Sequence, residues 1–242
     1  MTGDADAEPH VVVELREVSC IREGALLRHV SLRFARMSFN VLVGDRCSGL
    51  LLRLASLLEP PESGEVYLLG QATAAVDEAT RSKLRSRHFG FVFSSPCLLP
   101  GLSAAENVAM PLFKVLQLDH AEAAERTSDA LGFVGLRSLD HEDVDTLSRF
   151  DQQRVAFARA IAHRPAVIVL EHADTGLNGA EAAELLELAR RAREEFGATL
   201  LTTFASETAA RRSDRVLAVE DGVVCQDSAC AQAAETQQSS MS

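Results

Sequence analysis

The sequence contains very little lysine. Of the 24 basic residues in its 242, 22 are arginine and only Lys83 and Lys114 are lysine. Chemistry that requires a lysine ammonium group therefore has two places in the chain to find one. A composition rich in arginine and alanine is also what a GC-rich coding sequence would produce. The scarcity alone assigns no function, but it limits which functional motifs the chain can contain.

Positive charge is also in deficit. Asp and Glu number 35 against 24 Lys and Arg, which gives a formal net charge of −11, and the sequence has no basic run or arginine stripe. We therefore expect no nucleic-acid partner. The five cysteines are odd in number and include no C-x-x-C pair. They are predicted to be reduced thiols, and no structural metal site is expected.

Long apolar runs are absent. No stretch approaches the roughly 18 consecutive apolar residues that cross a membrane. The first ten residues, MTGDADAEPH, are acidic and lack the apolar segment of a secretory signal. These absences predict a cytoplasmic protein. Its 47% hydrophobic and 24% charged residues are typical of a folded globular chain.

The order of apolar segments predicts the fold class. We expect a tail over residues 1–9, a folded domain over 10–225 and a second tail over 226–242. Strands are predicted at 11–18, 26–34, 38–44, 65–70, 89–94, 166–170, 199–204 and 215–222. Helices are predicted at 51–61, around 81–87, over 103–136 with a break at Pro111, at 147–165 with Ser148 as N-cap, and at 179–197 with Gly197 as C-cap. This alternation favours an α/β fold with a mostly parallel core sheet, an antiparallel β layer and a helical subdomain inserted at about 95–164.

Four stretches carry a resemblance to a known family. They read ESGEVYLLG, FGFVF followed by CLLPGLSAAENVAMPL, LSRFDQQRVAFARAIAHRP, and DRVLAVEDGVV. In this order, over roughly residues 10–224, they resemble the nucleotide-binding subunits of ABC transporters, above all the lipoprotein-releasing and macrolide-exporting type. The resemblance implies a P-loop NTPase-like ABC ATPase fold and a peripheral position on the inner face of the cell membrane. It also implies two partners, a permease subunit and an ABC ATPase subunit in a homo- or heterodimer.

The region from Ser94 to Leu112 resembles the part of the family that meets the permease. Leu98, Leu99 and Pro100 fall in a loop-like stretch of this region, where exposed apolar residues often mark a contact surface. We interpret them as the docking loop. Val92 and Phe93, just before the region, are interpreted as core.

The P-loop motif G-x-x-x-x-G-K-[ST] cradles phosphates with backbone N–H groups, neutralises them with its lysine and holds Mg²⁺ with its hydroxyl. The corresponding segment here runs from Gly44 to Leu51 and reads GDRCSGLL. Gly44, Ser48 and Gly49 are remnants of the motif, but leucine stands at the lysine and hydroxyl positions. Losing one charge-assisted contact costs about 1.5–3 kcal/mol, or roughly ten- to a hundredfold in affinity. Binding of ATP and Mg²⁺ is therefore expected to be weak or absent, with the turn kept for folding.

At the other positions that the family uses for catalysis or nucleotide binding, most of the family's residues are also replaced. The Asp-Glu pair that ends the Walker B strand is Glu171-His172, which we interpret as vestigial catalytic positions. The signature loop keeps Ser148, a remnant of the phosphate contact, but loses both glycines to Arg149 and Phe150. Four further positions differ: Ser94 replaces the Q-loop glutamine, Asn178 the aspartate after Walker B, Ala205 the switch histidine, and Ile21 or Arg22 the aromatic that stacks on adenine.

These replacements favour a pseudo-ATPase with a structural or regulatory role at a permease, not expected to hydrolyse ATP efficiently. The alternative is a divergent but active ABC ATPase. In it, Arg46 would replace the lysine, Glu171 would reach the metal and His172 would act as the base for the attacking water. A third possibility is an interaction module that has left transport. The motifs G-x-S-x-G and H-E-x-x-H are absent, so the sequence gives no support to an unrelated hydrolase.

Overall fold

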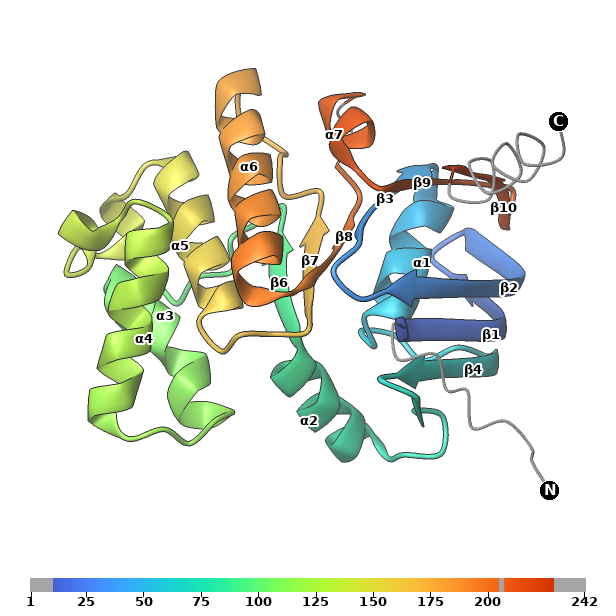
Figure 1. Ribbon diagram of the computed structural model, residues 1–242, viewed down its shortest axis with the longest axis horizontal. Coiled ribbons are helices and arrows are strands. Elements are labelled where there is room, and N and C mark those ends of the chain that lie inside the picture. The colour runs from blue at the N-terminus through green and yellow to red at the C-terminus, as the bar shows by residue number, and fades with distance from the viewer. Residues whose placement is uncertain (1–10, 205–206, 229–242) are drawn as a thin grey trace, which may run out of the picture.

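The computed structural model describes residues 11–204 and 207–228, which form two β-sheets with one helix between them and a group of helices beyond the larger sheet (Figure 1). The smaller sheet is antiparallel, with strand order β2-β1-β4-β5. Its strands are β1 (Val11–Arg22), β2 (Ala25–Ala35), β4 (Ser63–Leu68) and β5 (Gln71–Ala72).

The larger sheet has the order β10-β9-β3-β8-β7-β6, parallel throughout except for the edge strand β10. Its strands are β3 (Phe39–Gly44), β6 (Phe89–Phe93), β7 (Val167–Glu171), β8 (Thr199–Thr202), β9 (Arg215–Glu220) and β10 (Val223–Asp227). Strand β8 is buried along its whole length and β7 as far as Leu170, because helices or strands cover both of their faces.

Helix α1 (Arg46–Ala55) lies between the two sheets. Its leucines, including Leu50 and Leu51, pack in one cluster with Phe34 of the smaller sheet and Val169 of the larger one. Because both of its sides are covered, three consecutive leucines can be fully buried, which a helix on the surface would not allow. The helix is thus held by the core over nearly its whole circumference.

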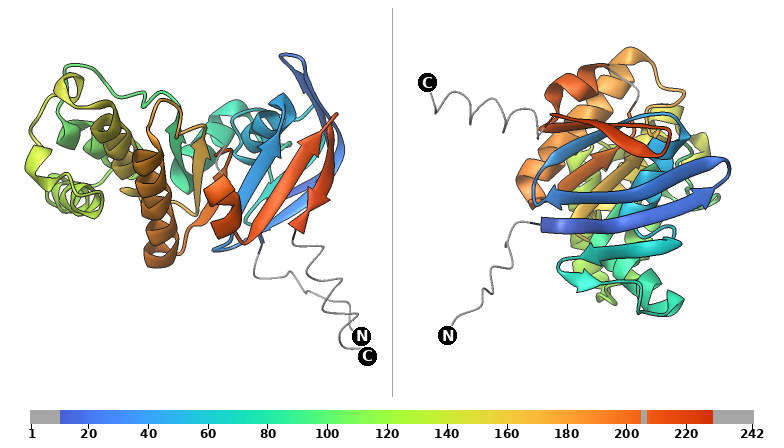
Figure 2. Two further views of the ribbon diagram at one scale, coloured as in Figure 1. Left: turned by 90° about the horizontal axis from the view of Figure 1, so that it is seen from above. Right: turned by 90° about the vertical axis from the view of Figure 1, so that its right-hand side faces the viewer.

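The remaining helices are α2 (Glu78–His88), α3 (Ala104–Lys114), α4 (His120–Phe133), α5 (Arg149–Ile161), α6 (Gly179–Phe196) and α7 (Glu207–Arg212), with short 3-10 turns at Arg137–Leu139 and Val144–Thr146. Of these, α2 packs on the same cluster as α1, and α3, α4, α5 and α6 pack on the cluster at the other face of the larger sheet. Helices α3, α4 and α5 pack together in a group at the end of the molecule opposite the smaller sheet (Figure 2). In the part of the chain that the structure describes, none of the helices combines the length and the apolar character needed to cross a membrane.

The α/β fold predicted from the sequence is confirmed, and so are two of the predicted caps. The Ser148 hydroxyl accepts the Asp151 N–H at the start of α5, and Gly197 adopts the left-handed conformation (φ 67°) that ends α6. The register of β1 against β2 is antiparallel, as expected for the β layer.

Three predicted boundaries are wrong. Helix α1 was expected at 51–61 but runs from Arg46 to Ala55, because Asp45 caps it immediately after β3. Pro111 does not break its helix: α3 continues to Lys114, stabilised by a capping box between Ser103 and Glu106. Gln226 and Asp227, which were expected to lie in a tail, belong to β10, which pairs with β9 as far as Asp227. Residues 1–10 and 229–242 lie outside the described residues.

Candidate functional site

A cleft of about 310 Å³ opens beside the start of α1, at the carboxyl ends of β3 and β7. In a parallel α/β sheet this is the edge at which ligands usually bind. The cleft is lined by Arg22, Glu23, Ala25, Asp45, Arg46, Gly49, Arg53, Glu171 and His172. Three of these are arginines and three are carboxylates, so the cleft has no excess of positive charge to attract phosphates.

The N-terminus of α1 is capped by a side chain of the protein. Helix α1 begins immediately after β3, with Asp45 as its N-cap, and the Asp45 carboxylate accepts the Cys47 N–H at 2.8 Å. This contact lowers the pKa of Asp45, so its carboxylate is held in the charged form. The partial positive charge of a helix N-terminus, which binds phosphate in a P-loop, here faces a carboxylate of the protein.

The three residues interpreted from the sequence as P-loop remnants make contacts within the fold. Gly44 has φ 129°, and a Cβ there would lie 2.1 Å from the Val219 carbonyl oxygen, so glycine is required for β3 to pack beside β9. The Ser48 hydroxyl is buried and donates to the Asp45 carbonyl at 2.8 Å. Gly49 is helical, with the Arg53 guanidinium 3.4 Å from where its Cβ would be.

An ion-pair chain crosses the cleft. Arg53 Nη1 donates to Glu171 Oε1 at 3.0 Å, and Arg53 Nε donates to Glu59 at 2.7 Å. Burial lowers the pKa of Arg53, but the two hydrogen bonds outweigh it and leave the pKa above its usual value. Arg22 continues the chain, 3.5 Å from Glu59 and 2.6 Å from Glu62. Glu171 is therefore engaged by a cation of the protein.

The sequence reasoning did not identify Arg53 or Glu59. A signal was present: Arg53 is the one charged residue in the mostly apolar run from Leu50 to Leu58. A lone charge within a helix expected to be buried requires a partner, and Glu171 at the end of a buried strand was one of few candidates.

His172 also lies at the cleft, as the sequence predicts for the residue after β7. Its backbone is left-handed (φ 49°), its N–H donates to the Thr203 hydroxyl at 3.1 Å, and its side chain is exposed. Arg46 lines the same cleft, and its guanidinium donates to the Glu23 carbonyl at 3.4 Å. The structure thus brings Arg46, Glu171 and His172 together around one space.

Ser148 caps α5 and has its hydroxyl engaged twice. It accepts the Asp151 N–H at 3.1 Å and donates to the Asp151 carboxylate at 2.6 Å. Burial raises the pKa of Asp151, but the hydrogen bonds from Ser148 and Arg154 outweigh it, so the net shift is downward. The cap therefore presents a negative charge beside the hydroxyl. Arg149 extends in the other direction and donates to the Ser94 carbonyl oxygen.

Of the remaining sequence-predicted positions that the structure describes, Arg22 lines the cleft, whereas Ile21, Ser94 and Asn178 do not. Asn178 is the N-cap of α6 and accepts the N–H groups of Ala180 and Glu181. Ile21 is 57% exposed near the tip of the β1–β2 hairpin. Ala205 lies outside the described residues. Among the residues that are described, no group of three or more His, Cys, Asp or Glu side chains is arranged to hold a metal ion.

The loop between β6 and α3 presents apolar side chains from a rigid base. Leu99 is 42% exposed, and Pro100 beside it is exposed as well. Beneath them the buried Asn107 accepts the Leu99 N–H at 2.7 Å and donates to the Leu99 carbonyl at 3.2 Å. Arg159 of α5 donates to the carbonyls of Pro96 and Cys97 at 2.8 and 2.6 Å. Val92 is fully buried, as predicted, and Phe93 is half-buried.

Comparison with known proteins gives a consistent picture. The family model described as ABC transporter matches residues 27–174. A lipoprotein-releasing system ATP-binding protein, LolD, of Bordetella avium is 36% identical over 199 residues, which span 81% of this chain and 86% of the relative. The LolD protein of Koribacter versatilis is 34% identical over 201 residues, covering 82% and 90% of the two chains.

Solved structures show the same architecture. The ATP-binding cassette MJ0796, in a dimeric post-hydrolysis state bound to ADP and Pi, superposes with a TM-score of 0.80 and 28% identity over 89% of this chain and 97% of that one. The fold is also shared by cbiO1 of Clostridium perfringens, with a TM-score of 0.82 and 20% identity over 90% and 88% of the two chains. The chain therefore belongs to the ABC transporter family, as an ATP-binding cassette domain with the P-loop NTPase-like fold.

Proposed function

We propose that this chain is a pseudo-ATPase subunit of an ABC transporter, which docks on a membrane permease and pairs with an ABC ATPase subunit without hydrolysing ATP efficiently itself. The observation that carries the proposal is the ion pair between Arg53 and Glu171 across the cleft, beside a helix start that is capped by Asp45. At the place where phosphate and metal would bind, a cation and a carboxylate of the protein already pair with each other.

The residues at the cleft do not fit Mg²⁺–ATP as a P-loop binds it. The lysine and hydroxyl positions are Leu50 and Leu51, both fully buried between the sheets, so neither side chain reaches the cleft. A phosphate approaching the start of α1 would meet the Asp45 carboxylate first. We derive no hydrolytic step for this site. The negative charge of Asp151 beside Ser148 would likewise disfavour a γ-phosphate presented by a partner subunit.

Isothermal titration calorimetry of Mg²⁺–ATP into the purified chain tests the proposal. We expect no saturable heat that arises at the cleft, that is, none that a substitution of Arg46 removes. MJ0796, whose structure holds ADP and Pi, serves as the positive control. Tight binding of Mg²⁺–ATP at the cleft, reduced by a substitution of Arg46, would overturn the proposal.

The docking part of the proposal rests on Leu99 and Pro100, which are exposed and apolar although Asn107 and Arg159 fix the loop beneath them. We expect the chain to copurify with a permease encoded near it. Leu99→Asp should abolish copurification without lowering the melting temperature. Met37→Asp is the matched control, since Met37 is 51% exposed but lies at the β2–β3 turn.

One observation favours a second candidate function. Arg46, Glu171 and His172 line the same cleft, so a divergent ATPase could use them together. This candidate predicts ATP hydrolysis in the presence of the permease that is lost in both Arg46→Ala and His172→Ala. Absence of hydrolysis in the assembled complex would eliminate it.

A further inference from the structure

A larger cavity, of about 640 Å³, lies at the opposite edge of the larger sheet. It is found where β6, β7 and β8 begin, whereas the cleft described above lies where β3 and β7 end. Its wall comes from the β2–β3 turn, the end of α2, the α3–α4 loop, α4 and the α5–β7 loop. We call it the arginine groove, after Arg36, Arg87, Arg126 and Arg164, which all line it.

The groove is positively charged although the protein carries a net charge of −11. No Asp or Glu is among the described residues that line it. Arg126 pairs with Glu122 at 2.7 Å, but Arg36, Arg87 and Arg164 form no ion pair with any residue that the structure describes. Burial, and next the neighbouring Arg87, lower the pKa of His88 on the same wall. Three of the four arginines of the groove therefore have no counter-ion among the described residues.

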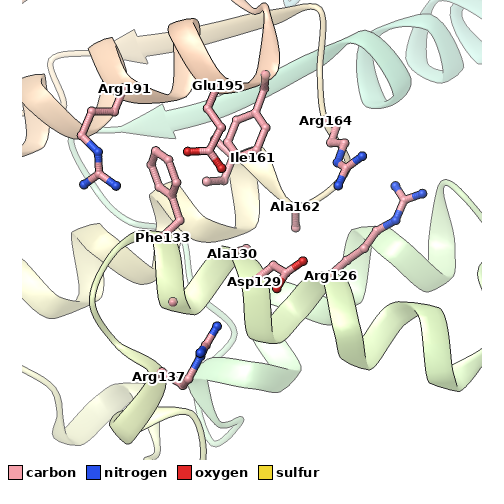
Figure 3. Close-up of a pocket in the computed structure, with 12 residues that line it drawn as sticks. Arg126, Asp129, Ala130, Phe133, Arg137, Ile161, Ala162, Arg164, Arg191 and Glu195 are labelled. Atoms are coloured by element: carbon pink, nitrogen blue, oxygen red, sulfur yellow. The ribbon is translucent and has the colours of Figure 1, made fainter.

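Arg126 and Arg164 reach the groove from different elements. Figure 3 shows Arg126 extending from α4 and Arg164 from the loop before β7, with their guanidinium groups on the same side of the adjoining pocket. That pocket, of about 520 Å³, shares both arginines with the groove and is also lined by Arg137 and Arg191 and by the carboxylates of Asp129 and Glu195. Cations from elements that are distant in sequence thus converge on one space.

Arg164 has a backbone conformation that is uncommon for arginine. Its φ of 54° is left-handed, a conformation that glycine and asparagine adopt at lower cost. Leu69 and Gln117, which also line the groove, are left-handed as well, with φ of 51° and 54°. Strained residues that persist around a cavity are more common at binding sites than elsewhere.

The groove also has an apolar wall. Val12, Leu69, Leu116, Leu118 and Phe196 line the space that the arginines border, and Leu69 is 37% exposed. A purely inorganic anion would leave this wall in contact with water. A ligand with an apolar part beside its negative group would cover it and pair the arginines at the same time.

We propose that the arginine groove binds a phosphorylated small molecule that has an apolar part. Guanidinium groups match the oxygens of phosphate in bidentate hydrogen bonds, and the volume is within the range of small-molecule sites. The proposal is independent of whether the cleft at α1 binds nucleotide. It assigns a ligand site to the edge of the sheet away from the P-loop segment.

The test is calorimetric titration of the full chain with three probes: inorganic tripolyphosphate, adenosine monophosphate without Mg²⁺, and dihexanoyl phosphatidic acid. We expect one saturable site, weakened by salt, for at least one of the two organic phosphates, and weaker binding of tripolyphosphate. A preference for the nucleotide would identify a soluble phosphate ester as the ligand class, and a preference for phosphatidic acid would identify a lipid headgroup.

Two substitutions locate the site. Arg164→Asn removes the charge and suits the left-handed backbone, so it should fold at least as well as the parent chain. We expect it, and Arg87→Gln, each to weaken binding about tenfold, as the loss of one charge-assisted contact would. Arg28→Gln, an exposed arginine of β2 outside the groove, makes the same change of charge and should have no effect.

The proposal is overturned if neither organic phosphate binds saturably, or if binding survives the double variant Arg87→Gln/Arg164→Asn. The same variants separate this proposal from the one on ATPase activity. Nucleotide binding that Arg164→Asn removes is located in the groove, whereas binding that Arg46→Ala removes is located in the cleft.

Discussion

Arg53 Nη1 lies 3.0 Å from Glu171 Oε1, so that a guanidinium from α1 meets the carboxylate at the end of β7. Arg53 is 26% and Glu171 16% exposed, so both charges are largely removed from water. Because Glu59 accepts a second hydrogen bond from Arg53, the guanidinium is held from two sides. The pair links the helix between the sheets to β7, the neighbour of the edge strand β6 in the larger sheet, at the cleft beside the start of α1.

Breaking this pair should destabilise the fold. Arg53→Met leaves the Glu171 carboxylate partly buried without its cation, and we expect a loss of about 1–3 kcal/mol in the free energy of unfolding. Urea denaturation followed by circular dichroism measures it. The control is Arg190→Met, which breaks the more exposed pairs of Arg190 with Glu187 and Glu194 and should cost under about 1 kcal/mol. Equal losses for the two variants would contradict the special role of the Arg53 pair.

The Asp45 cap should make stability depend on pH. Its pKa is lowered in the folded state, chiefly by the Cys47 N–H. Its contribution is therefore complete above the unfolded-state value of about 3.9 and is lost as pH falls through the lower folded-state pKa. Asp45→Ala should cost about 1 kcal/mol at neutral pH, whereas Asp45→Asn keeps the cap and should cost less. Melting temperatures measured between pH 7 and the acid limit should show that Asp45→Asn loses this part of the pH dependence.

Restoring the P-loop residues should not restore a nucleotide site. Leu50→Lys/Leu51→Ser places an ammonium group and a hydroxyl where two fully buried leucines pack between the sheets. We expect the double variant to lose several kcal/mol of stability, since each leucine alone contributes about 2–5 kcal/mol. Thermal denaturation checks this, with Leu50→Met as a control of similar volume. A folded double variant that binds Mg²⁺–ATP would show that the cleft needs only these two side chains.

Much of the fold follows from sequence patterns that tertiary contacts do not alter. The apolar run 166–170 could only be a strand covered on both faces, and Ser148 and Gly197 had the residue types that cap helices. The start of α1 could not be predicted in the same way. The segment beginning at Gly44 matches the spacing of a loop motif, but the helix begins directly after β3, because Asp45 caps it and leucines bury both of its sides.

In the site as well, residues placed by a local sequence pattern could be predicted, whereas residues brought together by tertiary contacts could not. The sequence places Glu171 and His172 at the end of a strand, and therefore at the cleft. It does not show that Glu59 and Arg22 complete a chain of ion pairs, because these residues come from segments that only the folded sheets bring together. The four arginines of the groove are likewise spread along the sequence, from residue 36 to residue 164, so that no single basic run reveals it.

Asn107 should hold the docking loop in place. Its side chain accepts the Leu99 N–H and donates to the carbonyls of Leu99 and Ser103, so Asn107→Ala leaves several loop groups without partners. We expect a loss of about 1–3 kcal/mol in stability and faster amide hydrogen exchange at residues 97–102. If the loop is the permease contact, copurification should weaken as well. Unchanged hydrogen exchange at these residues would show that the loop does not depend on Asn107.

The two glycines kept from the P-loop should respond differently to alanine. At Gly44 a Cβ would lie 2.1 Å from the Val219 carbonyl oxygen, on a backbone with φ 129°. Gly44→Ala must therefore push β3 away from β9, and we expect it to cost about 1–3 kcal/mol or more. At Gly49 the nearest atom is Arg53 Nη1 at 3.4 Å, at the end of a flexible side chain.

Because Gly49 lies within a helix, Gly49→Ala would gain up to about 1 kcal/mol of helix propensity, offset by any shift of Arg53 away from Glu171. We expect a change within about 1 kcal/mol of zero, measured by urea denaturation of both variants side by side. A P-loop that bound phosphate would need both glycines for its backbone N–H groups. Tolerance at Gly49 and intolerance at Gly44 would instead mean that sheet packing retains one glycine and that nothing in the isolated chain requires the other.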